Sequence, residues 1–305
     1  MLHRAHIDSP FDGLNISVIA TIPETRPKAI ILIVHGINGK KERFLPFMDY
    51  MTGKGYACVA HDHRGHGESI IKEEDRGYSY NGRSAAMTKD MRAVTRWISK
   101  DFPDIPIYML GHSMGSLAAR AYIREDDTDL NGLILCGSPS YNPLMWLGMF
   151  LTKPISLIKH GRVRPVIFQQ IMDNGYNRKF KNEGEKAWVC SDSNVRKTVK
   201  EDPSCNFSLT ADYSLTLLEL MRKAYSKTGW KSSNSSMPIL FLAGTDDPCI
   251  IDRHHFLMAV DAMRNIGYGN VSYRLFPGMR HEVLNETGKD KVWNEIVRFL
   301  ESDTD

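Results

Sequence analysis

Short apolar runs that repeat along the chain constrain its fold more than any other feature. They are residues 29–34 (AIILIV), 56–60 (YACVA), 106–110 (PIYML), 132–136 (GLILC) and 238–243 (PILFLA). A strand that is apolar on both faces belongs inside a sheet covered on both sides, as parallel strands are. Residues 15–22 (NISVIATI) alternate in polarity instead, which predicts an antiparallel strand.

Stretches with helical periodicity lie between these runs. Residues 84–100 place Met87, Met91, Val94 and Ile98 on one face, near the 3.6-residue spacing of a helix. Further helices are expected at residues 114–124, 252–265 and 288–301. Short apolar strands that alternate with helices predict an α/β protein with a doubly wound, mostly parallel sheet.

One long segment breaks this alternation. Residues 138–236 contain no convincing strand, which predicts a core made of residues 1–137 and 237–305 with a mainly helical insertion between its two parts. We call residues 138–236 the cap, because an insertion after the carboxyl end of a parallel strand covers whatever site lies there. Its apolar stretch, residues 143–158, is too short and too interrupted to span a bilayer.

The predicted strand PIYML runs directly into the sequence GHSMG, residues 111–115. This is a G-x-S-x-G motif at a strand-to-helix junction. A serine on that sharp turn is held in a strained conformation with its Oγ exposed, and the flanking glycines leave room for neighbouring elements. Ser113 is therefore the candidate nucleophile, and a serine that only caps the next helix is the alternative.

A serine nucleophile needs a base, and the base needs an orienting carboxylate, because a hydroxyl barely ionises at neutral pH. On this kind of sheet the chain order is Ser, then Asp or Glu, then His. Ser113, Asp247 and His281 follow that order, just after the predicted strands at residues 106–110, 238–243 and 271–276. Asp246 competes for the orienting role. We favour Asp247, because the following Pro248 biases its backbone towards extended geometry.

The turn after residues 29–34 is the candidate oxyanion hole. It reads HGING, and a glycine-containing turn there can aim the Ile37 amide into the site. The amide of Met114, directly after the nucleophile, is the expected second donor. An ordinary glycine turn is the alternative.

The segment HDHRGHGES, residues 61–69, contains three histidines and two acids. These are metal-ligand types, but Arg64 lies among them and no second cluster at ligand spacing completes a shell. We therefore predict a hydrogen-bonded loop that braces the site, and no metal. The chain lacks a phosphate-binding G-x-x-x-x-G-K-[ST] loop, and Gly65-x-Gly67 lacks the third glycine of a dinucleotide fingerprint, so no cofactor is expected.

Composition excludes other classes of function. The 305 residues carry a net charge of +3, with no basic stripe of the kind that nucleic-acid binding requires. The five cysteines are odd in number and form no C-x-x-C pair, which is typical of free thiols in a reducing compartment. The first twenty residues contain no apolar signal-peptide core, so a cytoplasmic protein is expected.

Several segments together resemble the motif series of the α/β-hydrolase superfamily. They are HGINGKKERF, HDHRGHGES, GHSMGS, GTDDPC and PGMRHEVLNE. Within the superfamily the chain is most similar to the monoacylglycerol lipase and lysophospholipase-like branch, which is grouped with serine aminopeptidase S33 sequences. The similarity is most specific at residues 29–140 and 238–301, and YNRKF and EDPSCNF extend it into the cap.

The resemblance implies an α/β-hydrolase fold with a mobile cap over an acyl pocket. It also implies the same roles for the residues singled out above, namely Ser113 as nucleophile, Asp247 as acid, His281 as base, and the amides of Ile37 and Met114 as oxyanion hole. The peptidase label of the grouping is often nominal, so it is not taken as an activity. Relatives differ most in the cap, so the resemblance implies least about the identity of the substrate.

Residues and resemblance together predict hydrolysis of a carboxylic ester. The apolar side chains of the cap favour a lipid monoester, a monoacylglycerol or a lysophospholipid, and a transient contact with a micelle or membrane. We expect His35, Gly36, His112 and Trp146 to contact the substrate. The alternatives are a small-ester esterase, thioesterase or aminopeptidase on the same triad, a non-catalytic binding protein of this fold, or a protein whose cap docks a partner. The sequence predicts no oligomeric state.

Overall fold

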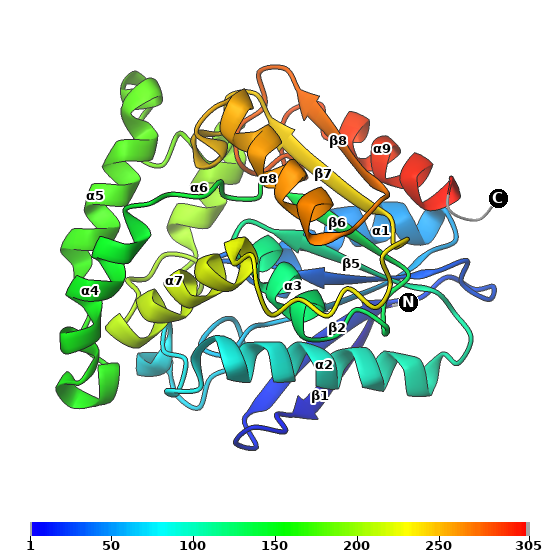
Figure 1. Ribbon diagram of the computed structural model, residues 1–305, viewed down its shortest axis with the longest axis horizontal. Coiled ribbons are helices and arrows are strands. Elements are labelled where there is room, and N and C mark those ends of the chain that lie inside the picture. Colours follow the sequence, from blue (N-terminus) through cyan, green and yellow to red (C-terminus); the bar gives the residue numbers. More distant parts are fainter. Residues whose placement is uncertain (1, 303–305) are drawn as a thin grey trace.

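A computed structural model describes residues 2–302 (Figure 1). Over this range eight strands form one sheet in the order β1-β2-β4-β3-β5-β6-β7-β8. The strands are β1 (Leu2–Asp8), β2 (Asn15–Thr21), β3 (Ile30–Val34), β4 (Ala57–His61), β5 (Ile107–His112), β6 (Gly132–Cys136), β7 (Ile239–Gly244) and β8 (Val271–Phe276). Strands β3 to β8 pair in parallel, whereas β1 and β2 are antiparallel to their neighbours. The predicted doubly wound, mostly parallel sheet is confirmed.

Helices cover both faces of this sheet. Within residues 2–302 the α-helices are α1 (Leu45–Gly53), α2 (Arg83–Asp101), α3 (Met114–Glu125), α4 (Met145–Ser156), α5 (Val166–Asn177), α6 (Ser193–Glu201), α7 (Ala211–Tyr225), α8 (Arg253–Ile266) and α9 (Asp290–Glu301). Short 3-10 turns occur at η1 (Lys41–Phe44), η2 (Glu73–Asp75), η3 (Ile158–Gly161), η4 (Arg178–Glu183) and η5 (Pro248–Ile250).

Two apolar cores hold these layers together. Buried side chains of α2, α3, α7 and α8 pack on one face of the sheet, and those of α1 and α9 pack on the other. The sequence pattern did not indicate β1 or α1. Strand β1 lies at the sheet edge and is largely exposed, so it lacks an apolar run. Helix α1 is short and carries Pro46 near its first turn, which obscures its periodicity.

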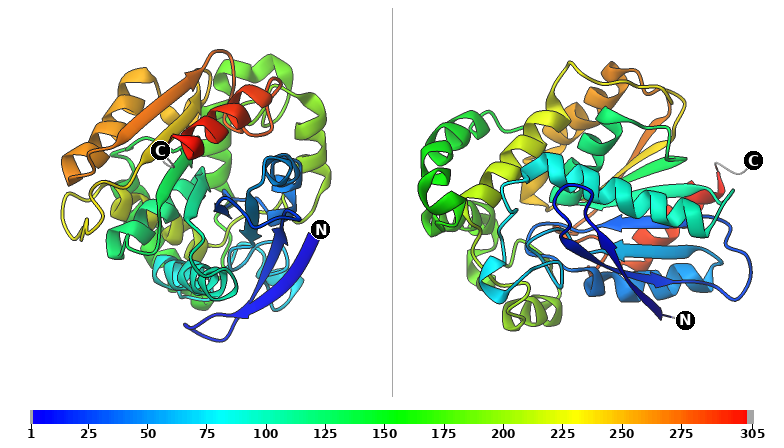
Figure 2. Two further views of the ribbon diagram at one scale, coloured as in Figure 1. Left: turned by 90° about the vertical axis from the view of Figure 1, so that its right-hand side faces the viewer. Right: turned by 90° about the horizontal axis from the view of Figure 1, so that it is seen from below.

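The chain between β6 and β7 forms helices α4 to α7 and, among the described residues, no strand. Helices α4 and α5 stand at one end of the molecule, away from the sheet, in Figure 1 and in the right-hand view of Figure 2. Helix α7 is different, because Tyr213, Leu220 and Ala224 are buried in the same core as α3. The division into body and cap at residues 138 and 236 stays a prediction. No helix within residues 2–302 is both long and apolar enough to cross a membrane.

A glycine lets the first turn of α3 lie directly against β3. A Cβ atom on Gly115 would lie 2.0 Å from the carbonyl oxygen of Val34. Since that neighbour is backbone in the centre of the sheet, it cannot move aside without disturbing the strand. The second glycine of the GHSMG motif is therefore required by this close approach.

We predict that Gly115→Ala destabilises the protein and that Gly148→Ala does not. The methyl group at position 115 overpacks against Val34, with an expected loss of about 1–3 kcal/mol in the free energy of unfolding. Gly148 lies within α4, where the nearest atoms to an added Cβ are 3.5 Å away on Leu218. Alanine there should raise stability by about 0.5–1 kcal/mol. Chemical denaturation of both variants measures the difference, and equal stabilities would contradict the packing argument.

Candidate active site

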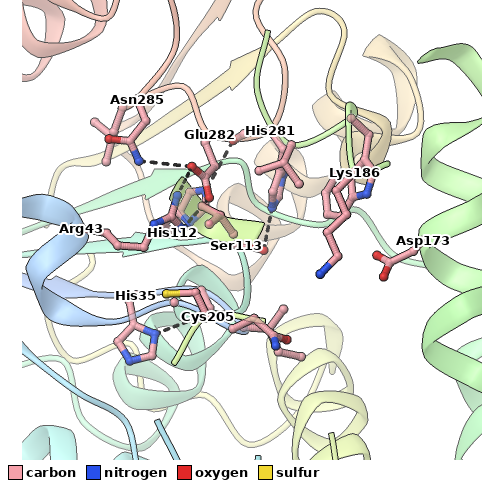
Figure 3. Close-up of a pocket in the computed structure, with 18 of the residues that line it drawn as sticks. His35, Arg43, His112, Ser113, Asp173, Lys186, Cys205, His281, Glu282 and Asn285 are labelled. Carbon is pink, nitrogen blue, oxygen red and sulfur yellow. Dashed lines mark hydrogen bonds and ion pairs between the residues drawn. The ribbon is translucent and has the colours of Figure 1, made fainter. Parts of the chain in front are cut away.

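Three side chains that lie far apart in the sequence meet above the carboxyl ends of the parallel strands. Ser113 lies between β5 and α3, Asp247 follows β7, and His281 follows β8. The Nε2 atom of His281 lies 2.8 Å from Ser113 Oγ, and its Nδ1 atom lies 3.1 and 3.0 Å from the two carboxylate oxygens of Asp247. Figure 3 shows Ser113 and His281 directed towards each other. This is the hydrogen-bonding order of a serine nucleophile, its base and an orienting acid.

The backbone of Ser113 is strained and held in place. Its φ of 54° and ψ of −120° lie outside the regions that non-glycine residues ordinarily adopt. Two hydrogen bonds fix this turn, one from the Ser113 amide to Cys136 O at 2.9 Å and one from the Ser116 amide to Ser113 O at 2.9 Å. The turn points Oγ towards the base, as the sequence motif predicts.

The structure separates the two adjacent aspartates. Asp247 is buried, and its carboxylate accepts a hydrogen bond from the Cys249 amide at 2.8 Å as well as facing His281. Asp246 instead forms an ion pair with Lys179 of the cap at 2.8 Å. The position next to the imidazole therefore belongs to Asp247, the residue that the sequence analysis favoured.

The surroundings of His281 make its imidazole a stronger base. Burial by itself lowers the pKa of His281, but the adjacent Asp247 carboxylate outweighs this effect, and the pKa lies well above its ordinary value. Cys249 Sγ lies 4.0 Å from Nε2. Burial raises the pKa of this thiol to about 11, so it is neutral at neutral pH. The Asp247 carboxylate is thus the charge that acts on the imidazole.

The turn after β3 lies against the nucleophile. A Cβ atom on Gly36 would lie 2.9 Å from Ser113 Cβ, so only glycine allows this approach. The Asn38 amide donates to His66 Nε2 at 3.2 Å, and the Asn38 side-chain amide donates to Phe207 O at 2.7 Å. These bonds hold the turn that carries the Ile37 amide.

The proposed oxyanion donors belong to the turn after β3 and to the first residue of α3. Ile37 lines the pocket around Ser113. Met114 is the first residue of α3, where an N–H group has no acceptor within the helix. Their role as donors to an oxyanion on a Ser113 adduct stays a proposal.

Residues 61–69 brace this turn through buried polar contacts. The fully buried Lys41 ammonium lies 2.6 Å from Asp62 and 2.8 Å from Glu68. His35 Nε2 accepts a hydrogen bond from the His63 amide at 2.9 Å. Among the described residues, one group of potential metal ligands lies close together, and it consists of Asp247, Cys249 and His281. The carboxylate and the imidazole of this group are already hydrogen-bonded to each other.

A small cavity of about 90 Å³ surrounds Ser113. His35, Gly36 and His112 line it, and their contact with a substrate stays a prediction. Trp146 lies elsewhere, in a hollow between α4, α7 and α8 that it shares with Met258. The structure does not bring this tryptophan to the nucleophile, because Trp146 lies on the side of α4 that faces α7 and α8.

Sequence reasoning missed other pocket residues. The Trp188 ring centroid lies 5.1 Å from that of His281, and no local pattern around position 188 signals this. Arg43 donates two hydrogen bonds to Glu282, at 2.7 and 2.5 Å. Burial raises the pKa of Glu282, but Arg43 outweighs it and lowers the value to about 2. The position of Glu282 next to His281 in the sequence was the available signal.

Comparison with known proteins identifies the family of the chain. The sequence matches the family described as serine aminopeptidase, S33, over residues 25–288, so the chain belongs to that family. It is 23% identical over 278 residues to phospholipase YtpA of Bacillus subtilis, covering 90% of this chain and 96% of the relative. It is 24% identical over 291 residues to a monoacylglycerol lipase of Mycolicibacterium smegmatis, covering 95% of this chain and 94% of that protein.

A solved structure supports the fold. A thermostable carboxyl esterase from Bacillus coagulans superimposes with a TM-score of 0.91 at 23% identity, covering 99% of this chain and 98% of the esterase. The α/β-hydrolase fold and the resemblance to lipases drawn from the sequence motifs are therefore confirmed. The protein is a serine hydrolase of the lipase and esterase type.

We predict that kcat/KM for ester hydrolysis rises with pH and that its midpoint lies above 6.5, the ordinary pKa of histidine. Only the neutral imidazole of His281 can accept the Ser113 proton, so activity is lost as pH falls through the raised pKa. Asp247→Asn removes the charge that raises this pKa. The midpoint should then move to lower pH, and the plateau rate should fall on the order of 10⁴-fold.

Asp246→Asn is the matched control for this pH profile. It removes a neighbouring carboxylate that pairs with Lys179 and leaves the imidazole contact intact. Its midpoint should therefore match that of the wild type. A shifted midpoint in Asp246→Asn, with none in Asp247→Asn, would refute the assignment of the orienting acid.

Proposed function

We propose that the protein hydrolyses carboxylic esters of monoacyl lipids, either monoacylglycerols or lysophospholipids, through an acyl-enzyme on Ser113. The observation that carries this proposal is the continuous hydrogen-bonded chain from Ser113 through His281 to Asp247. Ser113 and His281 line a pocket to which the cap also contributes residues. This arrangement turns an unreactive hydroxyl into a nucleophile at neutral pH.

The first half of the reaction forms the acyl-enzyme. Ser113 Oγ attacks the ester carbonyl while His281 Nε2 takes its proton, and Asp247 stabilises the imidazolium. The Ile37 and Met114 amides hold the oxyanion, each contributing about 3 kcal/mol to lowering the barrier. The carbon–oxygen bond to the alcohol then breaks, and His281 returns the proton to the leaving alcohol.

The second half releases the acid. A water molecule gives a proton to His281 and attacks the acyl carbon, and the oxyanion forms again in the same place. Collapse of this intermediate restores the Ser113 hydroxyl and frees a carboxylate. The same three side chains therefore serve both halves.

The cap supports a lipid substrate. Its large exposed apolar side chains include Leu144, Leu147, Phe150, Leu157, Ile167 and Ile171. Such a surface suits contact with a micelle or a membrane. The cavity of about 90 Å³ is far smaller than the space of about 300–1,000 Å³ that binds an organic ligand, so the cap has to shift before a lipid enters. Relatives named as a phospholipase and as a monoacylglycerol lipase support the same class.

A substrate panel tests this proposal. We predict that p-nitrophenyl esters of medium and long chains, a monoacylglycerol and a lysophospholipid are hydrolysed, and that an aminoacyl anilide is not. Ser113→Ala should reduce kcat on the order of 10⁵-fold or more while thermal unfolding stays unchanged, because only the attacking oxygen is lost. A sharp optimum at acetyl esters, faster cleavage of the anilide, or retention of the ester rate by Ser113→Ala would each overturn the proposal.

A further inference from the structure

Two charged side chains of the cap line the same pocket as Ser113. Asp173 belongs to α5, and Lys186 lies in the loop just before Trp188. Figure 3 shows the Lys186 ammonium directed into the space between Ser113 and Asp173. The cap therefore places one positive and one negative group above the nucleophile.

Both groups are half-buried and keep unused bonding capacity. The Lys186 ammonium donates one hydrogen bond, to Asn206 Oδ1 at 3.2 Å, although it has three protons. Within residues 2–302 the Asp173 carboxylate takes part in no hydrogen bond and no ion pair. Burial raises the pKa of Asp173, and the Lys186 charge partly opposes this rise. Each charge therefore acts on the other across the pocket.

Charges withdrawn from water are unfavourable unless a partner compensates them. The complementary ligand carries an anion for Lys186 and a cation for Asp173. Among monoacyl lipids, a lysophospholipid with an amino-alcohol head group offers both, through its phosphate and its ammonium. A monoacylglycerol offers only hydroxyl groups, which leave both charges poorly paired.

We propose that Lys186 and Asp173 form a head-group subsite that selects zwitterionic lysophospholipids, with the phosphate on Lys186 and the ammonium on Asp173. This inference rests on the proposed ester hydrolysis and names its substrate class. Water adds across the acyl ester, so the products are a fatty acid carboxylate and the intact glycerophospho-amino alcohol, which leaves with a proton from His281. The phosphate esters are not cleaved.

The test compares three lipids with the same acyl chain, all used as monomers. They are a neutral monoacylglycerol, an anionic lysophosphatidic acid and a zwitterionic lysophosphatidylethanolamine. Lys186→Met should lower kcat/KM about tenfold for both phosphate-bearing lipids and leave the monoacylglycerol unchanged. Asp173→Asn should lower it about tenfold for the zwitterion alone. Lys186→Arg should retain activity on all three lipids, since it preserves the charge.

Controls separate this inference from the proposed function. Lys181→Met removes an exposed cap lysine that does not line the pocket. It should leave kcat/KM unchanged for all three lipids. If the variants affect all three lipids equally, or if the wild type prefers the monoacylglycerol, the head-group subsite is overturned and ester hydrolysis stands. If the wild type hydrolyses no lipid while it still cleaves p-nitrophenyl esters, both the subsite and the lipid proposal fall.

A second and independent observation concerns Arg120 of α3, a fully buried cation that the mechanism above does not use. No carboxylate among the described residues forms an ion pair with it, and its Nε and Nη1 atoms have no hydrogen-bond partner there. Its guanidinium lies over the Tyr225 ring, 4.5 Å from the centroid, and Nη2 donates to Ser138 Oγ at 2.9 Å.

A chain of hydrogen bonds joins this cation to the nucleophile. Ser138 Oγ lies 2.9 Å from Ser116 Oγ, which lies 2.6 Å from the carbonyl oxygen of Ser113. Ser138 Oγ accepts from Arg120, and the Ser116 hydroxyl is the donor towards both Ser138 Oγ and the Ser113 carbonyl oxygen. The two hydroxyls therefore link the Arg120 guanidinium to the backbone of the Ser113 turn.

We infer that Arg120 is a positioning residue, which acts through Ser138 and Ser116 to hold the strained turn of Ser113. Arg120→Met and Ser138→Ala should each lower kcat about tenfold with KM unchanged. The double variant should fall no further than either single variant, because both interrupt one chain. The rate of Ser113 labelling by a fluorophosphonate should fall in parallel. Additive losses, or a Ser138→Ala variant with full kcat, would show that Arg120 is only structural.

Discussion

The close backbone contact between α3 and β3 is the constraint on which the rest of the site depends. Because Gly115 has no side chain, the first turn of α3 reaches the end of β3. That approach puts Ser113 beside the turn that contains Gly36 and carries the Ile37 amide. The packing of α3 against the sheet, and not a flexible side chain, therefore holds the nucleophile next to one proposed oxyanion donor. Preorganised donors of this kind are effective because they need no rearrangement during the reaction.

Ion pairs tie part of the cap to the loops that carry the acid and the base. Lys179 pairs with Asp246 at 2.8 Å, next to Asp247, and Arg280 pairs with Glu183 at 2.7 Å, next to His281. The Glu282 amide also donates to Val189 O at 2.8 Å. This tied part contrasts with α4 and α5, which expose apolar side chains at the end of the molecule. The tied part of the cap therefore helps to hold the loops that carry Asp247 and His281 in place.

Much of the body could be predicted because its signals are local. A run such as AIILIV indicates a doubly buried strand wherever it occurs, and GHSMG encodes a strand-to-helix turn within five residues. The cap could not be predicted in the same detail. Trp146 and Trp188 are both aromatic residues in apolar surroundings, and only Trp188 faces His281. Which tryptophan faces His281 depends on how separate segments of the cap pack together, and the periodicity of a single segment does not reveal this packing.

By itself, the sequence determined the class of sheet, the order Ser113, Asp247, His281, and the glycine turns beside them, because each is a short pattern with one favourable local geometry. Only the tertiary structure decided which of two adjacent aspartates meets the imidazole, and that Lys186 and Asp173 share the pocket with Ser113. Those outcomes follow from contacts between segments far apart in the chain. The packing of whole helices and strands sets which side chains meet, and a short sequence pattern does not reveal it.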